Sequence, residues 1–260
     1  MPKYFDIHSH LNFPDYEKDF PEVIGRLRET GTHTICVGTD LKSSEKAAKL
    51  AEIYPEIYAC IGMHPVDDPT MKFISKDFEK LVSHSKVVAI GECGLDFFHA
   101  KKEEDKERQE NDFREHIEFA LDHDKPLMIH SRSAYLELLD ILEPLAKEHG
   151  EKLRGNVHFF AGDVEIAKRF FNIGFTISFT GVITFARNYD EVIKYAPLDM
   201  LMSETDSPYV SPVPYRGKRN EPSYVSEVVK KIAEIREGGY DKVSETLLKT
   251  TKRVFGVNLA

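Results

Sequence analysis

Several features that would assign this chain to other classes of protein are missing from its sequence. The 260 residues contain no apolar run of membrane-spanning length. The first ten residues reach an acidic side chain and a His-x-His without an apolar stretch, so we expect no signal peptide. Only three cysteines are present, Cys36, Cys60 and Cys93, and none forms a CxxC pair. We therefore expect reduced thiols and a cytoplasmic protein with no membrane partner.

The sequence also lacks an excess of basic residues. Its 35 Lys and Arg are outnumbered by 44 Asp and Glu, which gives a net charge of −9. This charge opposes bulk electrostatic attraction to nucleic acid, although bound divalent ions and a local basic patch can reverse the sign at one site. No feature of the chain indicates an obligate protein partner.

No low-complexity segment, internal repeat or linker divides the chain, but strand-like and helix-like segments alternate along it. Eight short apolar segments are typical of buried strands: 4–7, 32–37, 57–61, 87–90, 126–129, 156–157, 175–179 and 200–203. Helical segments lie between or after them: 19–29, 43–53, 76–84, 103–123, 134–148, 164–171, 189–195, 223–235 and 243–255. We therefore predict one domain over residues 1–260, of class α/β, folded as a (β/α)8 TIM barrel. The alternative, a doubly wound sheet, usually has fewer strands, and no Gly-rich phosphate motif follows the first strand.

Histidines and carboxylates recur at or just after the ends of these predicted strands. They are His8, His10, Glu92, His130, His158 and Asp206. The ends of parallel strands in a barrel meet at one rim, so these six side chains would converge there. Imidazole nitrogens and carboxylate oxygens are metal ligands, and we predict that the six residues hold metal ions.

Each of these residues also has an interpretation without a metal. The His-x-His pair could be two polar residues leaving a strand, although alternation along a strand places both rings on one side. Glu92 follows a buried-looking strand and could be a helix N-cap or the ion-pair partner of Arg132. A buried carboxylate needs a cation or hydrogen-bond donors. Because its two oxygens can bridge two cations, we place Glu92 between metals.

Asp206 ends the eighth predicted strand and could bind metal, act as general base, or do both. Glu204, two residues earlier, competes for either role. Asp96 is predicted to be a loop residue or to orient a ligand. The remaining histidines are predicted to be surface or structural: His33, His84, His99, His116, His123 and His149.

Other residues near the strand ends suit a substrate. His64 and Arg132 would face it across the rim. Arg216 and Arg219 lie in a basic segment that follows Asp206 closely. Such a cluster is usually a solvated loop, but over a metal site it would suit a phosphate-bearing substrate, because Arg presents a bidentate fork to phosphate oxygens. Loop aromatics could stack on bases: Phe97, Phe98, Phe159, Phe160 and Tyr209.

Taken together, these motifs resemble the TatD family of metal-dependent deoxyribonucleases, within the amidohydrolase-like barrel superfamily. The matching segments occur in the family's order: 5–11, 62–65, 91–96, 129–132, 158–162, 204–208 and 216–222. Departures are small. Phe159 and Ala161 stand where the family often has Cys and Thr or Ser, and Ser133 stands where Asp is common.

The resemblance implies two divalent ions, Mg²⁺, Mn²⁺ or Zn²⁺. One would be held by His8, His10, Glu92 and Asp206, and the other by Glu92, His130 and His158. It also implies metal-dependent hydrolysis of phosphodiester bonds, often 3′→5′ on single-stranded DNA, with RNA a second substrate. Asp206 or Glu92 would remove a proton from the attacking water, and the cations with Arg132 would stabilise the developing charge.

Two other functions remain open at this point. An amidase, lactonase, esterase or aminoacyl-tRNA deacylase could use the same barrel and ligands against a carbonyl group. A non-catalytic module that binds metal or nucleic acid is the other alternative. The complete ligand set and the acidic net charge argue against such a module.

Overall fold

The structure, a computed structural model, describes residues 2–258. Its centre is one sheet of eight parallel strands, each hydrogen-bonded to the next in chain order. The strands are β1 Tyr4–Ser9, β2 Thr32–Val37, β3 Ile57–Ile61, β4 Val87–Asp96, β5 Leu127–Arg132, β6 Gly155–Val157, β7 Thr176–Phe179 and β8 Leu201–Ser203. The predicted (β/α)8 barrel is confirmed, and β2 and β3 have the predicted bounds.

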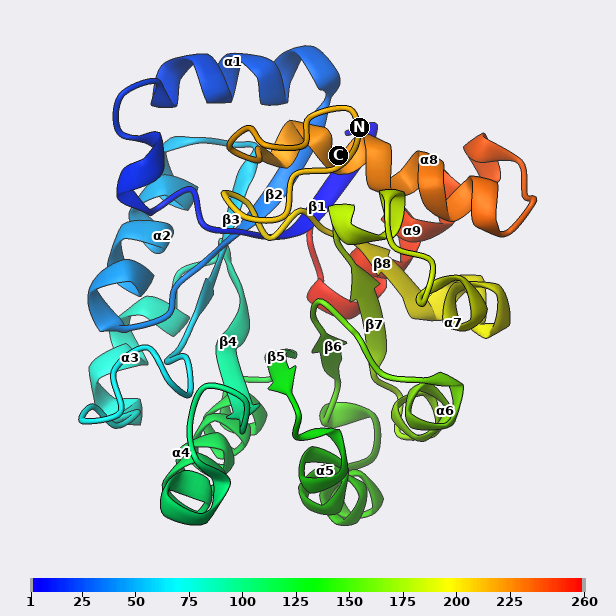
Figure 1. The fold of residues 1–260 in the computed structure, drawn as a ribbon. Helices are drawn as coiled ribbons and strands as arrows, with labels where there is room; N and C mark the ends of the chain where they lie inside the picture. Colours follow the sequence, from blue (N-terminus) through cyan, green and yellow to red (C-terminus); the bar gives the residue numbers. More distant parts are fainter. Residues whose placement is uncertain (1, 259–260) are drawn as a thin grey trace.

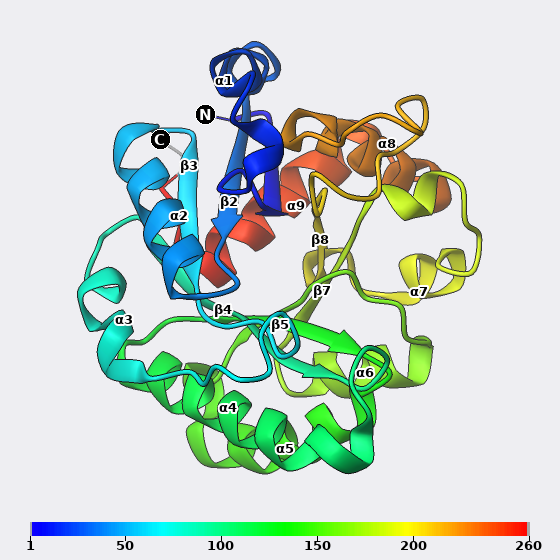
Figure 2. The same cartoon turned by 60° about the vertical axis from the view of Figure 1, so that its left-hand side comes forward.

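Helices surround the strands (Figure 1). They are α1 Phe20–Thr30, α2 Leu41–Ile53, α3 Ser75–Val82, α4 Lys102–Asp122, α5 Tyr135–His149, α6 Val164–Asn172, α7 Asp190–Tyr195, α8 Val225–Ile235 and α9 Tyr240–Phe255. Five short 3₁₀ turns complete the described chain: Pro14–Tyr16, Gly150–Lys152, Gly181–Thr184, Leu198–Met200 and Pro222–Tyr224. Figure 2 shows α4 and α5 covering the outer side of β4 and β5.

Local chemistry sets where several helices begin. The Asp40 carboxylate accepts a hydrogen bond from the Ser43 N–H at 2.6 Å, and the Ser43 hydroxyl oxygen accepts one from the Asp40 N–H at 2.9 Å. This reciprocal cap starts α2 two residues before the predicted Ser43. Asp163 caps α6 in a similar way, by accepting from the Ile166 N–H at 2.9 Å.

The barrel closes where β8 meets β1. No regular ladder joins these strands, but Ser9 and Ser207 form a parallel bridge just beyond β8. The Ser203 hydroxyl donates to the Phe5 carbonyl at 3.3 Å, and the Thr205 N–H donates to the buried Asp6 carboxyl at 2.8 Å. These contacts hold the end of β8 against β1 at the place where predicted site residues leave both strands.

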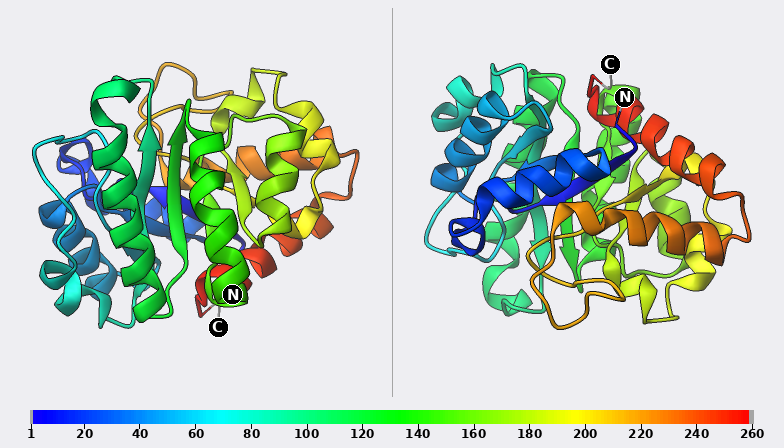
Figure 3. Two further views of the ribbon diagram at one scale, coloured as in Figure 1. Left: turned by 90° about the horizontal axis from the view of Figure 1, so that it is seen from below. Right: turned by 90° about the horizontal axis from the view of Figure 1, so that it is seen from above.

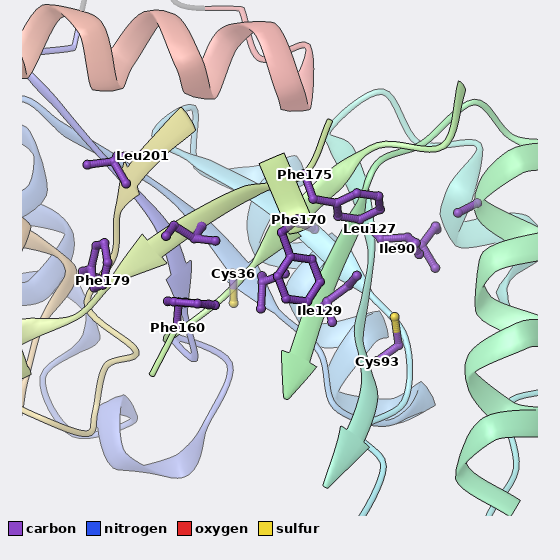
Figure 4. Close-up of a cluster of buried hydrophobic side chains, with 14 of the residues drawn as sticks. Cys36, Ile90, Cys93, Leu127, Ile129, Phe160, Phe170, Phe175, Phe179 and Leu201 are labelled. Atoms are coloured by element: carbon purple, nitrogen blue, oxygen red, sulfur yellow. The ribbon is translucent and has the colours of Figure 1, made fainter. Parts of the chain in front are cut away.

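Two groups of buried apolar side chains form the core. The larger lies between the strands and the helices, and Figure 4 shows part of it, with Phe170 near Ile129 and Phe175 near Leu127. The smaller joins alternate residues of β1 to β5 and β8 to Val254, Phe255 and Val257 at the end of the chain. Since alternate strand residues face opposite sides of a sheet, the smaller group fills the barrel interior.

The last helix and the loop after β8 lie at opposite ends of the barrel. In Figure 1 the segment after β8, coloured gold, lies in front of the strands, and α9, in red, lies behind them. The two ends of the described chain lie side by side (Figure 3). Within residues 2–258 we find no helix with both the length and the apolar character needed to span a membrane.

All three cysteines are free and buried in strands, as the predicted reduced thiols require. Burial raises the pKa of the Cys36 thiol to about 12, so this side chain stays protonated and behaves as a small apolar residue.

Candidate metal centre

The chain after β8 is tied to the His-x-His pair by main-chain hydrogen bonds. The Asp206 N–H donates to the His8 carbonyl at 2.9 Å, and the His10 N–H donates to the Ser207 carbonyl at 2.8 Å. Asp206 has a φ of 54°, in the left-handed region that Asp adopts more readily than most residues. This conformation turns the chain so that the Asp206 carboxylate faces the two imidazoles.

Four donor atoms converge on one point at this rim. The Nε2 atoms of His8 and His10 lie 3.3 Å apart. Glu92 Oε2 is 3.4 Å from His8 Nε2, and Asp206 Oδ1 is 3.5 Å from His10 Nε2. His8 Nε2 is 3.8 Å from Asp206 Oδ1, and His10 Nε2 is 3.9 Å from Glu92 Oε2. Ligands about 2.1 Å from a tetrahedral ion lie roughly 3.4 Å from one another, so the donor set fits a divalent ion.

A second group forms around the other oxygen of Glu92. Its Oε1 lies 3.0 Å from His130 Nδ1 and 2.8 Å from His158 Nε2, and those two nitrogens are 3.3 Å apart. His64, predicted to face the substrate, places its Nε2 3.7 Å from the same oxygen. Glu92 is 3% exposed, and each of its oxygens faces a separate group of imidazoles.

Carboxylates stand behind the histidines of the second group. His130 Nε2 lies 3.0 Å from Asp96 Oδ2, and His64 Nδ1 lies 2.6 Å from Asp67 Oδ1. Glu204 Oε1 is 3.6 Å from His158 Nδ1. In the first group, the partner found among the described residues is a backbone carbonyl instead of a carboxylate. The Val37 carbonyl oxygen lies 3.1 Å from His10 Nδ1. Carboxylate partners fix ring orientation and raise the basicity of a ligating imidazole.

Glu204 is held behind His158 and outside the pocket. Its carboxylate accepts hydrogen bonds from the Phe159 N–H at 2.6 Å and from the Ser178 hydroxyl at 2.7 Å, and the side chain is fully buried. Glu204 shares a potential three-residue cation cluster with His8 and His158. Its oxygens are already engaged, so we interpret it as a group that orients His158.

Burial and mutual charge set the ionisation of the centre. Burial alone would raise the pKa of Glu92, but the positive charges of His158 and His8 hold it well below its usual value. Burial also opposes protonation of His158, yet Glu92 and Glu204 raise its pKa well above the usual value. For Asp206, burial is outweighed by the hydrogen bond to His10 and nearby imidazoles, and the pKa is lowered. The carboxylates are therefore ionised, as metal ligands must be.

A pocket of about 390 Å³ opens over these donors. Five of the six predicted metal ligands line it, and His8 is buried beneath them with no exposed surface. His64 and Arg132 also line the pocket, as do Phe159 and Tyr209 from the predicted aromatic set. The pocket therefore brings reactive groups and substrate-facing side chains together at the ends of the strands.

Arg216 and Arg219 do not line this pocket. Arg219 donates to both oxygens of Asp19, at 2.7 and 2.6 Å, and to Glu221 at 3.3 Å. This pairing ties the loop after β8 to the start of α1. The Arg216 guanidinium lies 3.8 Å from the centre of the Phe185 ring. A role for either arginine in substrate binding stays a prediction.

Sequence reasoning missed several residues of the site. His99, predicted to be surface or structural, lines the pocket and places its Nδ1 2.7 Å from Asp96 Oδ2. Asp96 thus contacts His99 and His130, in the orienting place predicted for it. Asp67 was not singled out, although its spacing of three residues from His64 was a usable signal. Asp6 is the buried carboxyl that accepts hydrogen bonds from Thr205. Its position just before the His-x-His pair was the only sign of it in the sequence.

Comparison with known proteins finds relatives that are metal-dependent hydrolases. Residues 5–256 match the family described as TatD related DNase. The metal-dependent hydrolase YabD of Bacillus subtilis is 39% identical over 259 residues, which cover 98% of this chain and 99% of YabD. The metal-dependent hydrolase YcfH of Escherichia coli is 32% identical over 261 residues, covering 97% of this chain and 96% of YcfH.

Solved structures agree as well. The TatD homologue YjjV of Escherichia coli superposes with a TM-score of 0.89 and 28% identity, over 98% of this chain and 99% of that one. A TatD-family hydrolase of Entamoeba histolytica superposes with a TM-score of 0.86 and 22% identity, over 98% of each chain, and shows the shared fold. With the family match spanning nearly the whole sequence, the chain belongs to the TatD-related DNase family of metal-dependent hydrolases.

Proposed function

We propose that this hydrolase is a deoxyribonuclease that uses two divalent ions, acting as a 3′→5′ exonuclease on single-stranded DNA, with RNA as a second substrate. The observation that carries the proposal is Glu92. Its two oxygens face two separate donor groups at the bottom of one pocket. A carboxylate shared in this way is typical of two-metal sites that hydrolyse phosphodiesters. The family's description as a DNase supports the same substrate class.

His8, His10, Glu92 and Asp206 would hold one ion, and Glu92, His130 and His158 the other, with His64 at its margin. Bound divalent ions polarise a phosphoryl oxygen, lower the pKa of water and neutralise charge on the substrate. The mixed ligands accept Mg²⁺, Mn²⁺ or Zn²⁺. Four imidazoles favour Zn²⁺ or Mn²⁺, whereas phosphoryl chemistry and cellular abundance favour Mg²⁺.

Two residues that line the pocket, Asp206 and Arg132, would also act on the attacking water and on the phosphate. Asp206 is ionised and reaches the pocket, so its carboxylate can accept the proton that an attacking water loses. The Arg132 guanidinium also lines the pocket and has no carboxylate partner among residues 2–258. It is free to donate to the phosphate oxygens on which charge develops.

The direct test is cleavage of a 5′-labelled single-stranded oligonucleotide by metal-stripped protein, with Mg²⁺, Mn²⁺ or Zn²⁺ restored in turn. We expect a ladder of shortening products that requires metal and disappears in Glu92→Ala. Equal cleavage by Glu92→Ala would contradict the shared-carboxylate assignment.

A different outcome would favour carbonyl chemistry. If folded wild-type protein cuts no oligonucleotide with any of the three metals, the nuclease proposal fails. A panel of esters, lactones, amides and aminoacyl-tRNAs would then identify the hydrolysed bond, because the same donors can serve attack on a carbonyl carbon.

A further inference from the structure

Two phenylalanines behave differently from all the others in the protein. Of 17 phenylalanines, only Phe98 and Phe185 are exposed, at 63% and 42% of their surface. Each has an arginine guanidinium over its ring, Arg132 over Phe98 at 4.4 Å and Arg216 over Phe185 at 3.8 Å. An exposed ring under a guanidinium buries little apolar surface, so the place of the two pairs in the fold is informative.

Both pairs lie at the same end of the barrel as the pocket. Phe98 follows β4, and Arg132 is the last residue of β5. Phe185 follows the turn after β7, and Arg216 lies in the loop after β8. His99, which follows Phe98 of the first pair, lines the pocket. Tyr189 and Tyr209, from the two loops that carry the second pair, also line it. The first pair therefore borders the pocket through Arg132, and the second lies on two loops that each give one tyrosine to the pocket lining.

The two loops that carry the second pair are held together by close contacts. The Val213 N–H donates to the Thr184 hydroxyl at 2.9 Å and joins the two loops next to Phe185 and Arg216. A side chain at Gly181 would meet the Val210 carbonyl oxygen at 2.5 Å, so the loops also approach too closely for any other residue there. The place of the stack is thus fixed by backbone contacts.

Neither guanidinium is used to hold the structure together by an ion pair. Neighbouring arginines do form such pairs: Arg219 with Asp19, and Arg187 with Asp190 at 3.5 Å. In contrast, Arg132 and Arg216 contact no carboxylate among residues 2–258. A guanidinium that covers a ring with one face keeps its other face and its N–H edge open, which suits a base and a phosphate respectively.

We propose that Arg132–Phe98 and Arg216–Phe185 are two stacking subsites that hold unpaired bases of a single-stranded nucleic acid on either side of the cleaved bond. This inference rests on the proposed nuclease function. A net charge of −9 means that the strand must be held by local groups. Base stacking supplies such binding without sequence preference, and a duplex cannot use it because its base faces are covered. The enzyme therefore prefers single strands of at least several nucleotides.

The test is equilibrium binding of a fluorescent 12-nucleotide oligothymidylate and of a matched duplex, measured by anisotropy with Mg²⁺. Glu92→Ala serves as the non-cleaving parent. Phe185→Leu keeps the apolar volume and removes the ring, and Arg216→Lys keeps the charge and removes the planar stack. We expect each change to raise Kd for the single strand roughly five- to a hundredfold. Phe98→Leu should do the same.

Arg187→Ala is the matched control. Arg187 lies on the same loop as Phe185, pairs with Asp190, and within residues 2–258 lies over no aromatic ring. This variant should change Kd less than twofold. In cleaving protein, Phe185→Leu and Arg216→Lys should also reduce the preference for the 12-mer over a dinucleotide, expressed as a ratio of kcat/KM. Melting temperatures equal to the parent's would show that the variants are folded.

The outcomes separate this inference from the nuclease proposal. If Phe185→Leu and Arg216→Lys bind the 12-mer like the parent, or if Arg187→Ala weakens binding equally, the stacking subsites are refuted even when wild type cuts DNA. If wild type cuts no oligonucleotide but binds it in a manner that depends on Phe185 and Arg216, the subsites stand and the nuclease assignment fails. Loss of both binding and cleavage in wild type overturns both.

Discussion

At the scale of single residues, the centre is asymmetric. Histidines of one donor group have carboxylates within 4 Å of their outer nitrogens, as Asp96 lies behind His130. In the other group, among the described residues, His10 Nδ1 has the Val37 carbonyl and His8 Nδ1 has no carboxylate in that range. Asp96 is the clearest case. Burial would raise its pKa, but hydrogen bonds to His130 and His99 lower it, so the carboxylate stays ionised. The His130 imidazole, a candidate metal ligand, is thereby held in one orientation.

Replacing Asp96 with Asn should weaken metal binding in the group that contains His130. Asn keeps the size of the side chain but removes the charge that holds the imidazole, and losses of about 10- to 100-fold in affinity follow such changes. Competition with a chromophoric chelator measures this loss. His99→Gln is the control, since it removes the other imidazole that contacts Asp96 and leaves His130 in place. Identical affinities for wild type and Asp96→Asn would refute the orienting role.

The residue types at the strand ends could be predicted from the sequence, but their partners could not. Apolar segments that end in His or Glu place these side chains at the rim of a barrel whatever the details of packing. Contacts between segments far apart in the sequence decide which nitrogen of His130 faces Glu92. They also place His64 beside Glu92. The same holds for Arg219, whose partner Asp19 lies 200 residues away.

At the scale of secondary structure, β4 shows where sequence reasoning stops. The predicted strand ends at Ile90, just before Gly91 and Glu92. In the structure β4 continues to Asp96. Its register against β5 shifts between Ile90 and Cys93, where Gly91 lies, and Gly94 pairs with His130. A Cβ at Gly94 would lie 2.1 Å from the His130 carbonyl oxygen. The glycines allow β4 and β5 to approach each other closely, which brings Glu92 within reach of His130.

Gly94→Ala should therefore destabilise the protein and disturb the metal centre together. Gly94 has a φ of 139°, which alanine adopts only with strain, and the added methyl group would collide with backbone. We expect a loss of at least about 2 kcal/mol in the free energy of unfolding, measured by urea denaturation. Gly25→Ala is the matched control. It lies inside α1 with nothing within 4 Å of its Cβ position, and should stabilise by about 0.5–1 kcal/mol. A neutral Gly94→Ala would contradict the close-approach argument.

At the scale of the whole molecule, acid stability depends on a histidine outside the pocket. His116 of α4 is 1% exposed and accepts a hydrogen bond from the Met63 N–H at 3.0 Å, next to His64. Its Nδ1 donates to the Asp112 carbonyl at 2.7 Å. Burial lowers the pKa of His116 from 6.5 to about 4. The sequence marked it only as structural or surface, because burial of a helix face against the loop after β3 is a tertiary property.

The stability that neutral His116 contributes to the folded protein should be lost as the pH falls from about 6.5 to about 4. In this window the unfolded chain binds a proton at His116 and the folded chain does not, so the stabilisation is complete above pH 6.5 and is lost towards pH 4. The effect amounts to about 3 kcal/mol. His116→Gln can keep both hydrogen bonds without titrating, so its unfolding free energy should depend less steeply on pH across this window. Parallel pH profiles for wild type and variant would refute the assignment.

The most direct test of the whole account counts metal equivalents against cleavage. Metal-stripped protein would be titrated with Mn²⁺ by calorimetry, while cleavage of a labelled single-stranded oligonucleotide is followed at each equivalent. Because Glu92 gives one oxygen to each donor group, we predict two bound ions per chain, cleavage that develops with the second, and loss of paired binding in Glu92→Ala. Full activity with one equivalent, or two ions still bound by Glu92→Ala, would contradict the shared centre.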